Sequence, residues 1–172
     1  MIPALTAIEV KEDIKRLKGV RAKARVSLFK SSDMLFCEDG EIQFREDSIS
    51  GICVMNMSSF LPVSERGQLS NPMEECRISV NFVPDLETPR LLGFLKAEAA
   101  GAGASAEDML ATLVKKPLIK EILFRTGIEP SAAGAGLTMT DIMEIANGLR
   151  MFELSPQGRK GWKAVSYTHL RA

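Results

Sequence analysis

The sequence has very little histidine and tyrosine, since its 172 residues include only one of each. Both His169 and Tyr167 fall in residues 165–172, which resemble a translated sequencing adaptor, and we expect these residues to form a non-native tail. The rest of the sequence then lacks histidine, which is the commonest general base and the commonest metal ligand. This absence excludes hydrolysis by a histidine-activated serine or cysteine. We expect no catalytic residues and no metal ligands.

Other absences narrow the classes of protein further. The sequence contains none of the patterns GxGxxG, GxxxxGK[ST], HExxH and GxSxG. No apolar run approaches the roughly 18 to 20 residues that span a bilayer, and residues 1–16 carry charges throughout, so we expect neither a membrane span nor a signal peptide. Carboxylates are plentiful, but they lie in mixed-charge stretches typical of solvated surface. The sequence therefore favours a binding protein over an enzyme, with no cofactor.

The cysteines point to the cellular compartment. Cys37, Cys53 and Cys76 are odd in number and widely spaced. Such spacing favours neither a disulfide framework nor a zinc knuckle. We therefore expect buried thiols in a reducing, cytoplasmic environment.

The apolar pattern predicts an α+β fold, in which a small antiparallel β-barrel follows an amphipathic helix and precedes a three-helix module with a short hairpin. Thr6 to Glu9 form a capping-box pattern before near-helical apolar spacing, which predicts a helix over 7–18 in an N-terminal segment, 1–19. Short apolar runs separated by turn formers predict a barrel domain over 20–101. The predicted strands are 24–29, 34–37, 41–44, 51–57, 76–83 and 91–96.

The second half of the chain predicts helices. An Ala/Gly-rich stretch at 97–106 predicts a linker, with a domain boundary near residue 102. The module that follows, 102–164, has one helix capped at Ser105, a second over 118–125 ending at Gly127, and a third over 140–150.

Residues 151–164 predict a strand, a turn and a strand, so that the module resembles a winged helix. The wing would carry Arg159 and Lys160 toward phosphates. The third helix presents Asp141 and Glu144, which oppose the approach of phosphate. We therefore do not expect the module to bind DNA, and a helical interaction module is the better interpretation.

Charge is segregated near the N-terminus of a chain that is neutral overall. Residues 11–30 hold eight basic side chains against two acidic ones, whereas residues 33–47 hold six acidic side chains against one basic one. Two interpretations stay open: an anion-binding face, or two segments that pair with each other.

Two short motifs accompany this reversal of charge. Arg21 and Arg25 form RxxxR, and Glu46, Ser48 and Gly51 follow as ExSxxG. The pair resembles the PilZ family of cyclic di-GMP receptor barrels, marked by RxxxR and then [DN]xSxxG, over residues 20–97. Glu46 departs from the family pattern, where Asp or Asn is usual.

The resemblance implies that these five residues bind cyclic di-GMP, with the arginines contacting phosphate and guanine. It implies a bacterial signalling protein whose ligand repositions the helical module against a protein partner. It also implies that residues 24–97 close into a barrel with Arg25 and Ser48 on one outer surface. The alternatives are a structural or adaptor protein without a small ligand and, third, a winged-helix DNA-binding regulator.

Overall fold

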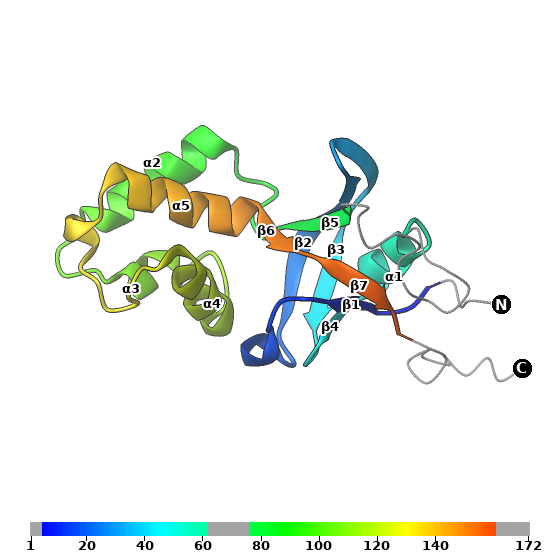
Figure 1. The fold of residues 1–172 in the computed structure, drawn as a ribbon. Helices are drawn as coiled ribbons and strands as arrows, with labels where there is room; N and C mark the ends of the chain where they lie inside the picture. Colours follow the sequence, from blue (N-terminus) through cyan, green and yellow to red (C-terminus); the bar gives the residue numbers. More distant parts are fainter. Residues whose placement is uncertain (1–4, 62–75, 161–172) are drawn as a thin grey trace, which may run out of the picture.

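The computed structural model describes residues 5–61 and 76–160 (Figure 1). These residues form a mixed α+β fold with a seven-stranded sheet and five α-helices. The strand order is β6-β5-β2-β3-β4-β1-β7, and every pairing is antiparallel. The strands are β1 (Ile8–Val10), β2 (Arg21–Lys30), β3 (Asp33–Phe44), β4 (Ser48–Ser50), β5 (Cys76–Asn81), β6 (Phe152–Leu154) and β7 (Pro156–Arg159).

The long hairpin β2–β3 is the centre of the sheet, and its residues pair from Arg21↔Gln43 to Lys30↔Asp33. Alternation along β2 leaves Arg21 and Arg25 exposed and buries Val26 and Leu28 completely. The hairpin therefore presents one charged surface and contributes its apolar side chains to the core.

The two edges of the sheet are joined by consecutive residues. β6 pairs with β5 at one edge and β7 pairs with β1 at the other, yet only Ser155 separates β6 from β7. The sheet must curl to bring its edges together, and Phe44, Phe82 and Phe152 pack together with ring centroids 5.4–6.3 Å apart. The predicted antiparallel sheet is thus present and curled, but its hydrogen-bonded ladder is not shown to close into a barrel.

Four helices form a module beside the sheet (Figure 1), in which α5 packs on α2 and α4. They are α2 (Thr88–Ala99), α3 (Ala106–Leu110), α4 (Lys116–Thr126) and α5 (Met139–Arg150). Capping boxes begin α3 at Ser105 and α5 at Thr138, and α4 ends at Gly127 in the left-handed conformation with φ 72°. The helices predicted from these local signals are confirmed.

Three predicted elements are wrong. Residues 7–18 form β1 and a 3-10 turn, η1 (Lys15–Leu17), rather than a helix, because β1 pairs with both β4 and β7. Residues 51–57 and 91–96 form helices, α1 (Ile52–Ser58) and α2, rather than strands. In α2, Leu91 and Leu95 are fully buried at helical spacing. Short apolar runs suit either element, and tertiary packing decides between them.

The predicted hairpin after the third helix is also wrong, because β6 and β7 pair with different strands and not with each other. The winged-helix layout is therefore absent from the described residues. A domain boundary near residue 102 stays a prediction, although α2 lies before it and contacts α3 and α5. The predicted tail, 165–172, lies outside the described residues. None of the helices in the described ranges has the length and apolar character needed to cross a membrane.

Candidate binding groove

The segregated charges pair with each other across the β2–β3 hairpin. Arg25 donates from Nε to Asp39 Oδ1 at 2.6 Å and from Nη2 to Oδ2 at 2.9 Å. The hydrogen bond and the opposite charge raise the pKa of Arg25, and the same hydrogen bond lowers the pKa of Asp39. Arg21 lies 3.5 Å from Glu41. Of the two interpretations of the charge pattern, pairing between the segments is confirmed.

The residues of the second motif serve local structure. Glu46 forms an ion pair with Lys18 at 3.0 Å, and Ser48 is fully buried in β4. Gly51 caps α1 with φ 111°, and a Cβ there would stand 2.1 Å from the carbonyl oxygen of Glu41. Since Ser48 has no exposed surface, the expectation that it shares an outer surface with Arg25 is wrong.

The two basic residues expected on a wing hold β7 against its neighbours. Arg159 donates from Nη2 to the Leu61 carbonyl at 3.0 Å, and burial lowers the pKa of its guanidinium. Lys160 contacts Glu9 at 3.1 Å and Asp47 at 2.6 Å. Arg159 and Lys160 therefore do not lie on a projecting hairpin from which they could contact a nucleic acid.

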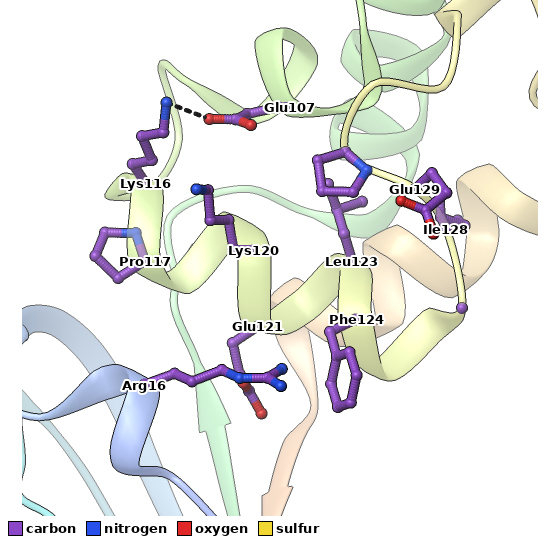
Figure 2. A pocket seen from close by; sticks show the side chains of 12 residues that line it. Arg16, Glu107, Lys116, Pro117, Lys120, Glu121, Leu123, Phe124, Ile128 and Glu129 are labelled. Carbon is purple, nitrogen blue, oxygen red and sulfur yellow. Dashed lines mark ion pairs between the residues drawn. The ribbon is translucent and has the colours of Figure 1, made fainter.

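A groove lies where the sheet meets the helical module (Figure 2), with a volume of about 1000 Å³. η1, on the sheet side, contributes Arg16, and α4 contributes most of the remaining wall. The lining residues are Arg16, Glu107, Lys116, Pro117, Lys120, Glu121, Leu123, Phe124, Gly127, Ile128, Glu129 and Pro130.

Arg16 reaches the helical module because its neighbours anchor η1 in the core. Ile14 and Leu17 are fully buried, which leaves Arg16 exposed between them. Its guanidinium carbon lies 4.3 Å from the centroid of the Phe124 ring. Phe124 is itself 64% exposed. The groove therefore depends on both halves of the fold, and the cation–π contact between Arg16 and Phe124 joins them.

Some of the charged residues in the groove are already paired. Lys116 lies 2.8 Å from Glu107, and this contact raises the pKa of Lys116. Glu121, only 4% exposed, accepts a hydrogen bond from Arg125 Nε at 3.0 Å. Each of these charges therefore already has a partner within the protein, exposed for Lys116 and buried for Glu121.

The remaining charges are Arg16, Lys120 and Glu129, which form no ion pair within residues 5–61 and 76–160. Figure 2 shows Lys120 near the Lys116–Glu107 ion pair, Glu129 across the groove from Lys120, and Arg16 reaching toward Glu121 and Phe124. Among the three charges without an ion pair, two cations stand against one carboxylate. No group of three His, Cys, Asp or Glu side chains in the described ranges is arranged to hold a metal ion.

Only part of this groove could be predicted from local sequence patterns. α4 and its stop at Gly127 were predictable, and Arg16 belongs to the basic run. Their contact was not, because more than a hundred residues separate Arg16 from Phe124 and no local pattern reports such a pairing. Arg21 and Arg25 form the spaced pair of the RxxxR motif, but Arg16 is the arginine of the basic run that lines the groove.

A protein-family model described as "HI0933-like protein barrel and H2TH domain" matches residues 2–165. No curated protein matches the chain. The family match overturns the resemblance to the PilZ family and, with it, the hypothesis of a cyclic di-GMP receptor in bacterial signalling. The physical reason is that RxxxR and SxxG are short patterns, and here they serve strand pairing and a backbone turn.

Proposed function

Because this chain belongs to the HI0933-like barrel and H2TH domain family, we propose that it is a ligand-binding module that works beside a flavin site rather than as one. The family is one of flavoproteins. The observation that carries the proposal is the groove formed jointly by η1 and α4, with Arg16 resting on Phe124. The volume of the groove lies within the range of small-molecule sites, in which apolar walls carry a few polar or charged groups that orient the ligand.

The described residues do not fit a flavin nucleotide. Such cofactors are commonly held where a glycine-rich turn leads from a parallel strand into a helix whose N–H groups receive phosphate. All strand pairings here are antiparallel. Among the described α-helices only α1 has a glycine N-cap, and the backbone of Gly51 packs closely against the Glu41 carbonyl. We therefore derive no chemical step through a flavin in this chain.

The proposed module binds without catalysing a reaction. Its lining offers lysine, arginine and glutamate side chains, and Lys116 and Glu121 are held by other residues. The lining contains no serine, threonine or cysteine nucleophile beside a base. In this proposal, the flavin is carried by a protein partner, and the groove binds a small molecule and positions it for that flavin.

We also propose that the curled sheet functions as a closed barrel. The support is the continuous path from β6 through Ser155 to β7, which links the two edges. A closed wall would give η1 a rigid base from which Arg16 meets α4.

Backbone NMR of the full chain tests the binding role. We expect FMN and FAD to produce no saturable shifts, whereas small aromatic probes, taken as a mixed set of neutral, anionic and cationic compounds, shift the amides of η1 and α4. Micromolar, stoichiometric binding of a flavin would overturn the proposal. So would saturable probe shifts confined to the outer surface of β2–β3.

A further inference from the structure

We infer that the groove takes a small organic anion with a flat apolar body, of the class of an aromatic carboxylate. This inference rests on the proposed binding role of the groove and adds the chemical class of its occupant. Three observations carry it: the uncommitted cations, the geometry of Arg16, and the apolar wall.

The balance of free charge favours an anion. Once Lys116 and Glu121 are assigned to their partners within the protein, Arg16 and Lys120 face one opposing carboxylate, Glu129. Lys120 is exposed on α4, one turn after Lys116. Glu129 lies across the groove from Lys120 (Figure 2). The charges of the groove that form no ion pair are therefore two cations against one carboxylate, and this balance favours an anionic occupant.

Arg16 is oriented for such a group. Its guanidinium carbon lies 4.3 Å from the centroid of the Phe124 ring, and Figure 2 shows the side chain extended along the groove toward that ring. A guanidinium that rests on an aromatic face keeps the N–H donors on its edge free for a carboxylate. The ring also limits the rotamers of Arg16, which lowers the entropy lost when an anion binds.

The rest of the wall favours a flat apolar body. Leu123 and Ile128 are buried at the back of the groove, and Pro117 and Pro130 add rigid apolar surface. Phe124, 64% exposed, offers an aromatic edge on which a second ring can pack. The volume of about 1000 Å³ accommodates a molecule larger than a simple inorganic anion.

The test compares matched probes on the full chain by backbone NMR titration. 2-Naphthoate carries both features, 2-naphthalenemethanol keeps the rings without the charge, acetate keeps the charge without the rings, and 2-naphthylmethylamine reverses the charge. We expect 2-naphthoate to shift the amides of η1 and α4 and to bind at least about tenfold more tightly than the other three.

Variants then assign the charge to named residues. Lys120→Gln and Arg16→Gln should each weaken 2-naphthoate by about tenfold, and Lys120→Arg should retain binding. Lys96→Gln is the matched control, because Lys96 is an exposed lysine on α2 that does not line the groove. It should leave the affinity unchanged. The amide spectrum of each variant reports whether the fold is intact.

The outcomes separate this inference from the proposed function. Equal binding of 2-naphthoate and 2-naphthalenemethanol in the groove, or tighter binding of the amine, would overturn the anionic class and leave the binding role standing. Equal weakening by Lys120→Gln and Lys96→Gln would overturn the assignment of the anion contact to Lys120. Failure of every probe to shift η1 and α4 at millimolar concentration would overturn the inference and the proposed function together.

Discussion

Arg125 of α4 lies over the ring of Phe152 in β6, with its guanidinium carbon 3.8 Å from the ring centroid. The same guanidinium donates to the Glu121 carboxylate at 3.0 Å and to the Glu153 carbonyl at 2.9 Å. Glu121 is 4% exposed, and within residues 5–61 and 76–160 its ion-pair partner is Arg125. A single side chain thus neutralises a buried acid of the helical module and fastens that module to the sheet.

Replacing Arg125 with alanine should lower the free energy of unfolding by about 3 kcal/mol, because it leaves the Glu121 carboxylate buried without its partner. A guanidinium chloride titration measures the loss. Arg77→Ala is the control, since its ion pair with Glu153 is exposed and should contribute less than about 1 kcal/mol. Equal losses in the two variants would contradict the role given to Arg125.

Gly51→Ala should destabilise the protein by about 3 kcal/mol or more. The residue has φ 111°, and a Cβ would stand 2.1 Å from the Glu41 carbonyl oxygen. Gly93→Ala in α2 is the matched control, because no atom lies within 4 Å of its Cβ position. That change should stabilise the protein by about 0.5–1 kcal/mol. Urea titration of both variants checks the prediction, and a Gly51→Ala variant as stable as the parent would contradict it.

Cys53 should make stability fall at alkaline pH. Burial raises the pKa of the Cys53 thiol, and the nearby Glu38 and Glu41 carboxylates act in the same direction. The folded state therefore favours the neutral thiol. Its contribution is full below the unfolded pKa, roughly 8.5, and is lost as pH rises through the folded pKa.

Denaturant titrations between pH 7 and pH 10 should show a steeper decline for the parent chain than for Cys53→Ala. A thiol reagent should modify the exposed Cys37 quickly and Cys53 only as the protein opens. Identical pH profiles for the two proteins, or rapid modification of Cys53 in the folded state, would contradict this prediction.

Thr138→Ala should lower the free energy of unfolding by about 1 kcal/mol, because the Thr138 hydroxyl accepts a hydrogen bond from the Asp141 amide at the start of α5. The hydrogen bonds that Thr138 donates to the Asp141 carboxylate also lower the pKa of that carboxyl. An acid with a lowered pKa stabilises the fold above its unfolded pKa, about 4, and loses this contribution as pH falls through the folded value.

Asp141→Asn should therefore flatten the loss of stability between pH 5 and pH 3, measured by thermal unfolding. Glu144→Gln, at an exposed position of the same helix, is the control and should not flatten the profile in the same way. If Asp141→Asn leaves the loss of stability between pH 5 and pH 3 the same as in the parent protein, the capping box is not the cause of that loss.

Elements marked by local chemistry could be predicted from the sequence. Ser105 and Thr138 begin helices because each lies three residues before an aspartate that completes the capping box. Gly127 ends α4 because glycine adopts positive φ without strain. The pairing of the basic and acidic segments was also open to prediction, since two neighbouring runs of opposite charge can face each other across one hairpin.

Elements that depend on distant partners could not be predicted. The Thr6 to Glu9 pattern suggested a helix, but the Thr6 hydroxyl donates to the Lys160 carbonyl at 2.8 Å. That partner lies at the other end of the described chain. The motif that suggested a ligand failed for the same reason, since nothing near Ser48 in sequence reports that β1 and β3 flank β4 and bury it.

The path from β6 through Ser155 to β7 has a consequence for synthesis of the protein. When a ribosome has translated only as far as α5, β1 and β5 have been made, but β7 and β6, which pair with their outer edges, have not. During that interval two open strand edges are available for pairing with other chains. Residues 152–159 then pair with both of these strand edges at almost the same time. The Lys160 amide donates a hydrogen bond to the Ala7 carbonyl at 2.9 Å. Nascent chains stalled before residue 152 should therefore be the form most prone to aggregation and most dependent on chaperones.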